Sequence, residues 1–94
     1  MTITKDEAER IARDYVKAQE AGAGIELVLL DESTMERDFG WVFFYDSKSH
    51  AETGDINYAV AGNAPIVVTR VDGTVHVTGT ALPVERYLER FCRR

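Results

Sequence analysis

The chain has 94 residues, the size of one domain, and its 45% hydrophobic and 29% charged residues are typical of a folded globular protein. Its 16 acidic and 11 basic residues leave a formal net charge of −5, which repels a phosphate backbone and excludes sequence-independent nucleic-acid binding. No apolar run approaches the roughly 18–20 residues that cross a membrane. We therefore expect a single domain over residues 1–94 that binds neither nucleic acid nor membrane.

The N-terminal segment and the cysteine content favour a cytoplasmic location. Residues 1–7 (MTITKDE) carry no apolar stretch behind a basic start, so they do not resemble a secretory signal. The single cysteine, Cys92, cannot form an internal disulfide, which fits a reducing compartment.

The first predicted element is a helix that begins after Thr4. Thr4 and Glu7 have the spacing of a capping box, in which hydroxyl and carboxylate each accept a backbone N–H at the helix start. Apolar residues then recur at three- and four-residue steps from Ala8 to Val16, as one face of a helix requires. Residues 21–24 (AGAG) predict its end, because glycine adopts the left-handed C-terminal conformation without steric cost.

The middle of the chain predicts two strands separated by polar loops. Residues 25–30 are rich in branched side chains, and residues 41–45 (WVFFY) are apolar on both faces, which predicts a central strand. Residues 31–40 and 46–55 are polar and acidic, and we expect both to be loops. Residues 56–62 fit either a short strand or an extended crossing.

A β-hairpin follows, because residues 66–71 and 74–78 flank Asp72-Gly73, a strong signal for a two-residue turn. In that register Val71 pairs with Thr74, and Val68 pairs with Val77. One face of the hairpin then carries Ile66, Val68, Val75 and Val77. The other carries Val67, Thr69, Thr74, His76 and Thr78.

Pro83 predicts the start of a C-terminal helix, because proline suits the first helical turn. The apolar face of this helix is formed by Val84, Tyr87, Leu88 and Phe91. The order of elements predicts an α+β domain: an N-terminal helix, a mainly antiparallel sheet of about four strands with a C-terminal β-hairpin, and a C-terminal helix.

Acidic residues are concentrated in the middle of the chain. Residues 20–55 hold nine acids against Arg37 and Lys48. Such acids either solvate the loops or form a negative surface that attracts a basic partner, such as the basic surface that many nucleases present. The candidate partner-binding acids are Glu32, Glu36, Asp38, Asp46, Glu52 and Asp55.

The aromatic strand supplies a second candidate, since Trp41, Phe43 and Tyr45 share one face of it. Packing in the core accounts for most such residues. Trp and Tyr are also the commonest anchors of protein interfaces. Either helices cover both faces of the sheet, or one face leaves Trp41 or Tyr45 exposed as a partner-binding anchor.

Signals for catalysis or metal binding are weak. His50 and His76 have no partner at metal-ligand spacing, and Cys92 has no sequence-local base to activate it. The adjacent acids Asp31 and Glu32 lie in a predicted loop, which is a poor signal for calcium or for acid–base catalysis. We therefore expect no catalytic residue, no metal and no cofactor, and a protein that is not an enzyme.

Three sequence motifs in the C-terminal half are more distinctive than the overall composition: residues 62–68 (GNAPIVV), 72–75 (DGTV) and 79–88 (GTALPVERYL). With the capped first helix and the strand at 40–43 (GWVF), they resemble the immunity protein 35 family, also called the YrhB-like domain, over nearly the whole chain. The glycines and prolines in these motifs shape turns and strand ends. The resemblance therefore implies a fold and a family, and it transfers no site residue.

Membership would imply a bacterial protein that neutralises a toxin domain encoded beside it. The first hypothesis is therefore an immunity protein that binds a cognate toxin, as a monomer or homodimer; its negative charge suits a basic nuclease-type toxin. A second, also implied by the relatives, is a small heat-stable chaperone-like protein that binds unfolded clients. A small enzyme or ligand-binding domain is the third, and the sequence shows no convergent polar pocket for it.

Overall fold

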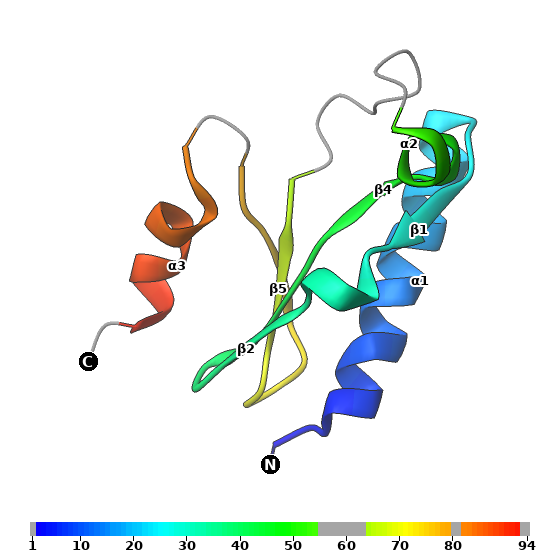
Figure 1. The fold of residues 1–94 in the computed structure, drawn as a ribbon. Coiled ribbons are helices and arrows are strands. Elements are labelled where there is room, and N and C mark those ends of the chain that lie inside the picture. Colours follow the sequence, from blue (N-terminus) through cyan, green and yellow to red (C-terminus); the bar gives the residue numbers. More distant parts are fainter. Residues whose placement is uncertain (1, 55–63, 80–81, 93–94) are drawn as a thin grey trace.

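The computed structural model describes residues 2–54, 64–79 and 82–92 and has the predicted α+β architecture (Figure 1). The helices and strands, in chain order, are α1 (Lys5–Ala23), β1 (Leu27–Leu29), the 3₁₀ helix η1 (Asp31–Ser33), β2 (Met35–Arg37), β3 (Gly40–Phe43), β4 (Tyr45–Ser47), α2 (Lys48–Thr53), β5 (Ile66–Thr69), β6 (Val75–Val77) and α3 (Val84–Cys92). Four strands form one antiparallel sheet in the order β2-β3-β5-β6, and β1 pairs antiparallel with β4 in a smaller sheet.

Helix α1 begins and ends where the sequence predicts. The Thr4 N–H donates to the Glu7 carboxylate at 2.9 Å, and the Glu7 N–H donates to the Thr4 hydroxyl at 3.2 Å, so the capping box is complete. Gly24 ends the helix with a φ of 72°, in the left-handed region that glycine tolerates. Ala8, Ala12 and Val16 are buried, which confirms the apolar face.

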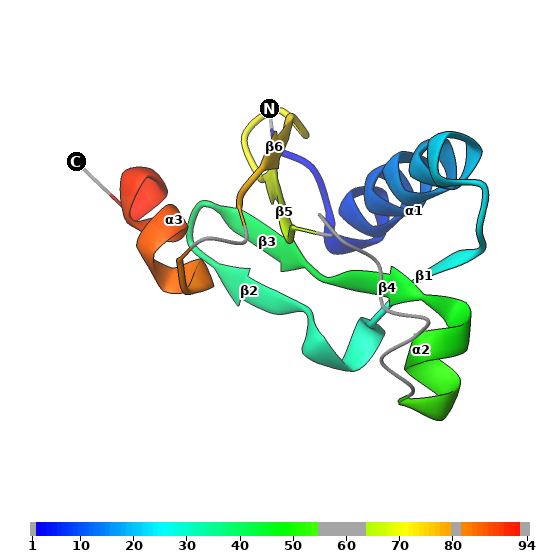
Figure 2. The same ribbon diagram turned by 90° about the horizontal axis from the view of Figure 1, so that it is seen from above.

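Strand β3 is the centre of the larger sheet, and all four of its residues are buried. Trp41 and Phe43 pack against Ala8 and Ala12 of α1. Val42 points to the opposite face and packs in a second cluster with Leu88 of α3. The two long helices therefore cover opposite faces of the sheet (Figure 2), which resolves the alternatives left open by the sequence.

The predicted single strand over residues 41–45 is in fact two strands in two sheets. Strand β3 ends at Phe43, and β4 begins at Tyr45 and pairs with β1. Tyr45 then packs with Val16 and Leu27 in a third cluster between α1 and the smaller sheet. Phe44 lies at the switch and packs on the α3 side of the larger sheet.

Both predicted loops were wrong, because each contains regular structure. Residues 31–40 form η1 and β2, and β2 turns directly into β3 with Arg37 paired to Gly40. Residues 46–53 hold the end of β4 and helix α2, which the Ser47 side chain caps by accepting the His50 N–H at 3.0 Å. These elements are polar because an edge strand and a surface helix bury few side chains.

The β5–β6 hairpin has the predicted faces but not the predicted turn. Ile66 pairs with Val77 and Val68 with Val75, which leaves a four-residue loop between Thr69 and Thr74. A type I′ turn needs positive φ at both central residues, and in this loop only Gly73 has it. The shift of two residues keeps every side chain on its predicted face.

Helix α3 follows Pro83, whose carbonyl accepts the Arg86 N–H at 3.0 Å. Leu88 is buried on the sheet, and Val84 and Phe91 pack beside it, which confirms the predicted apolar face. The segment over residues 56–62, for which the sequence left two alternatives, lies outside the described residues.

Candidate functional site

Four exposed carboxylates follow one side of the molecule. Strand β2 is the outer strand of the larger sheet and η1 precedes it. Figure 2 shows β2, η1 and α2 along the same side, and Figure 1 shows β2 and α2 toward opposite ends of that side. Apart from Asp31 of η1, which pairs with Arg13 of α1, the carboxylates on these elements and on the β2–β3 turn are those of Glu32, Glu36, Asp38 and Glu52, all exposed as the sequence suggested. We call this group the acidic edge.

Arg70 anchors the middle of the acidic edge from the neighbouring hairpin. Its guanidinium lies 4.4 Å from the ring centre of Trp41 and donates to the backbone carbonyls of Arg37 at 2.8 Å and Asp38 at 3.3 Å. It also donates to the Glu36 carboxylate at 3.2 Å. The Arg70 guanidinium thus partly neutralises the charge of Glu36, whereas the structure gives no ion pair for Glu32, Asp38 or Glu52 among the described residues.

The two aromatic candidates are not surface anchors. Trp41 is 1% exposed and Tyr45 is 6% exposed, so the expectation that either contacts a partner directly is wrong for this fold. The reason is that α1 covers their face, with the Tyr45 ring edge-on to Tyr15 at 6.3 Å between centres. Burial is also the main cause that raises the pKa of the Tyr45 hydroxyl, followed by the neighbouring Tyr15.

Asp46 also falls outside the acidic edge. The Asp46 side chain is only 13% exposed; its carboxylate accepts the Ser47 N–H at 2.7 Å and contacts Nδ1 of His50. It therefore holds the start of α2 in place and is not available as a free surface charge. Sequence reasoning missed this pair, although a spacing of four residues was the available signal. Asp55 lies outside the described residues.

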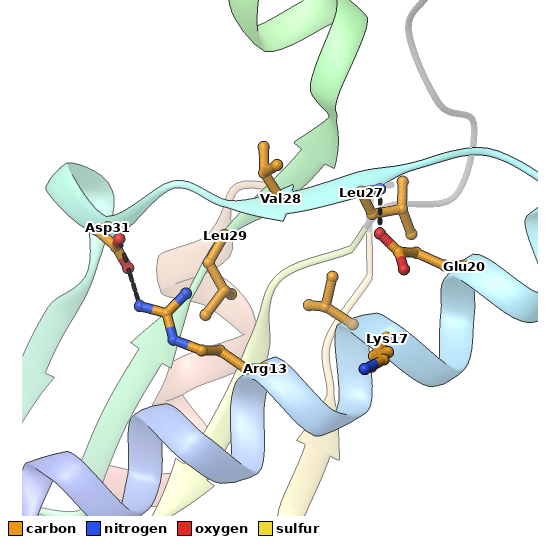
Figure 3. Close-up of a pocket in the computed structure, with 8 residues that line it drawn as sticks. Arg13, Lys17, Glu20, Leu27, Val28, Leu29 and Asp31 are labelled. Carbon is orange, nitrogen blue, oxygen red and sulfur yellow. Dashed lines mark hydrogen bonds and ion pairs between the residues drawn. The ribbon is translucent and has the colours of Figure 1, made fainter.

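A shallow groove separates α1 from β1 (Figure 3). Its volume is about 420 Å³, and Leu29 lines it. Arg13 closes one end by pairing with Asp31 at 3.3 Å, and Glu20 closes the other by accepting the Leu27 N–H at 2.8 Å. These contacts connect the helix to the strand, so the groove's charges serve the fold.

The other chemically capable residues do not converge. Within the described ranges, no group of three His, Cys, Asp or Glu side chains is placed to hold a metal ion. His76 lies on β6 with its ring edge-on to Phe91 at 5.1 Å between centres. The side chain of Cys92 lies outside what the structure describes. None of the helices described is long and apolar enough to cross a membrane.

Comparison with known proteins places the chain. The model of the family described as immunity protein 35 matches residues 6–91. The chain belongs to the immunity protein 35 family. The family name describes an immunity protein, and the matched residues reach every helix and strand from α1 to α3.

One curated relative of this immunity protein 35 domain is an Escherichia coli (strain K12) protein described as uncharacterized protein YrhB. The two sequences are 40% identical over 52 residues. The match spans 55% of this chain and 55% of the relative, so the chain covers about half the length of that protein. No solved structure matches the chain.

Proposed function

We propose that this protein binds a cognate bacterial toxin through the acidic edge and neutralises it by occupying its surface. The observation that carries the proposal is that Glu32, Glu36, Asp38 and Glu52 are all exposed and belong to elements that line one side of the fold in Figure 2. Family membership supports an immunity role, and the charge supports a partner with a basic surface.

The fold gives these carboxylates a preformed arrangement. Glu36 and Asp38 belong to a hairpin whose other strand, β3, is buried in the sheet, and Arg70 bonds the turn from the side. Because the backbone under these charges is already ordered, binding costs less conformational entropy than ordering a mobile loop would. A negative surface also raises the rate of encounter with a basic partner, an effect that salt reduces over a Debye length of about 8 Å at physiological ionic strength.

A basic nuclease-type toxin fits this surface best. Enzymes that act on nucleic acid carry cationic side chains where the phosphates bind. Carboxylates at the acidic edge would pair with those cations and so block the same surface that the substrate needs. No catalytic residue of the immunity protein is required for that inhibition.

The test is co-expression with the toxin domain encoded beside the gene, followed by growth rescue and pull-down. We expect the double variant Glu32→Lys/Asp38→Lys to lose rescue and to associate at least about tenfold more slowly, because two like-charge repulsions replace attractions. Its association rate should also depend less steeply on salt. The matched control, Asp14→Lys/Glu89→Lys, makes the same change of charge on exposed positions of α1 and α3 and should rescue growth normally.

Two outcomes would contradict the proposal. If both double variants slow association equally, net charge matters and the acidic edge does not. If the acidic-edge variant binds like wild type, the toxin uses another surface. A broad set of clients in the pull-down with little salt dependence would favour the chaperone-like alternative. The structure gives that alternative little support, because helices cover both faces of the larger sheet.

A further inference from the structure

Strand β6 has an outer edge whose backbone groups point away from the sheet. The Thr69 N–H donates to the Thr74 carbonyl and the Thr78 N–H donates to the Pro65 carbonyl, both at 3.0 Å. Residues along an antiparallel strand alternate between bonding to the partner and pointing outward. Val75 and Val77 therefore direct their N–H and C=O groups outward, and β6 is the last strand of its sheet.

This edge lacks the usual protection against pairing. Natural edge strands carry charges, prolines or bulges, or are covered by another element. Strand β2, at the other edge, carries Glu36 and Arg37, whereas residues 74–78 contain no charged residue other than a titratable His76. Val77 is 52% exposed. In the part of the chain that the structure describes, no strand or helix lies beyond β6 on this side (Figure 2).

We propose that the β6 edge pairs with the β6 edge of a second copy of this chain, antiparallel about a two-fold axis through His76. Residues 74–78 read Thr-Val-His-Val-Thr, which is the same in both directions. The pairing therefore sets Val75 opposite Val77 and Thr74 opposite Thr78 of the second copy. All four outward groups of Val75 and Val77 gain partners, because these residues form the hydrogen-bonded pairs.

A second copy fits this edge better than an unrelated strand for two reasons. Cross-strand pairs of β-branched residues stabilise antiparallel sheets, and the palindrome produces only such pairs around the central His76. The distribution of charge also favours a second copy, since the uncharged β6 edge lies at the opposite side of the sheet from β2 and the acidic edge. Two chains of net charge −5 thereby meet where each is uncharged and keep their acidic edges far apart.

The dimer would be a continuous sheet in which each copy contributes its four strands. Val77 would be covered by Val75 of the second copy on the α1 side. Because the contact spans only about five residues from each chain, the interface is small, and we expect it to form at roughly 100 µM and above.

The first test is sedimentation velocity from about 10 µM to about 1 mM. We expect wild type to shift from monomer to dimer over this range. Val77→Lys should weaken the dimer at least about tenfold, because it places a charge at the junction on each chain. The matched control Val71→Lys changes a valine that is 63% exposed in the loop and should dimerise like wild type.

A second test uses hydrogen exchange, which needs no variant. Hydrogen exchange on wild type should slow at the amides of Val75 and Val77 as concentration rises, while exchange at other exposed amides stays constant.

A third test uses disulfide trapping at the two-fold axis. The variant His76→Cys in a Cys92→Ser background should form an intermolecular disulfide, since facing non-hydrogen-bonded residues have Cα atoms about 4.5 Å apart. Val71→Cys in the same background is the control for random collision.

The proposal is overturned if wild type remains monomeric at about 1 mM. A dimer that Val77→Lys leaves unchanged, or that forms without protecting Val75 and Val77, overturns it as well. These results are independent of toxin binding, because the acidic edge belongs to other strands and its test uses other variants.

Discussion

Gly40 begins β3 with a φ of 151°, and a Cβ placed there would lie 2.1 Å from the carbonyl oxygen of Val68. Strands β3 and β5 pack too closely at this point for any side chain. We expect Gly40→Ala to lower the free energy of unfolding by about 3 kcal/mol or more. Urea denaturation measures this loss. Gly22→Ala is the control, since α1 leaves open space there, and we expect a gain of about 0.5–1 kcal/mol.

Asp72, in the β5–β6 loop, makes the free energy of unfolding depend on pH. Its carboxylate accepts hydrogen bonds from the Thr69 hydroxyl and, at 3.0 Å, from the Thr74 N–H. These bonds, the Thr69 bond first, lower the pKa of Asp72 below its ordinary value of 3.8. A carboxyl whose pKa is lower in the folded state stabilises the fold above its unfolded pKa and loses that effect as pH falls through the folded value.

We therefore expect Asp72→Asn to be less stable than wild type at pH 7. The difference should shrink as pH falls below 3.8 and vanish only below the lowered pKa of the folded state, where the folded wild-type side chain is also neutral. Urea unfolding of both proteins along a pH series measures the difference. A difference that stays constant down to the lowest pH would show that shape, and not charge, sets the contribution of this residue.

At the scale of elements, Arg70 connects the two hairpins of the larger sheet. Its backbone N–H donates to the Phe39 carbonyl at 2.8 Å, and its backbone carbonyl accepts the Ile3 N–H at 2.9 Å. Its guanidinium reaches the carbonyls of Arg37 and Asp38. Lysine has no planar fork for these bonds, so we expect Arg70→Lys to cost about 1–2 kcal/mol.

The control for that variant is Arg37→Lys. Arg37 is exposed and its guanidinium donates to the neighbouring Glu36 carbonyl alone among the described residues, so the change should stay within about 0.5 kcal/mol. Thermal unfolding followed by circular dichroism distinguishes the two. Equal effects would mean that Arg70 contributes through general packing and not through its hydrogen bonds.

Local chemistry explains which elements were predictable from the sequence. The capping box at Thr4, the helix end at Gly24 and the start of α3 after Pro83 each depend on neighbouring residues, and all three are confirmed. Strands β2 and β4 are three residues long, too short for a period of two to stand out. The predicted two-residue turn was wrong. The backbone groups of Arg70 bond to Phe39 and Ile3 and not across the hairpin, and these long-range contacts are not visible in any local sequence pattern.

At the scale of the whole molecule, the candidate site was only half predictable. Composition located the acids of residues 20–55, and those on η1, β2 and α2 are exposed as expected. The burial of Trp41 depends on which helix covers which face of the sheet, and the internal contacts of Asp46 depend on where α2 begins. These are tertiary facts, so the sequence could name both residues as candidates without revealing that the fold uses them internally.

The change of sheet at Phe44 has a consequence for how the molecule can deform. Strands β3 and β4 follow one another directly, yet their hydrogen-bonded neighbours belong to two different sheets. The apolar clusters of the two sheets are joined through Tyr15 and Leu29. Tyr45, Val16 and Leu27 form the smaller cluster, and the partly buried Tyr15 and Leu29 pack against both clusters, so opening β1 and β4 would also loosen contacts of the larger core. A binding surface that spans Asp38 on one side of this junction and Glu52 on the other therefore keeps its shape only while Tyr15 and Leu29 hold the two sheets together.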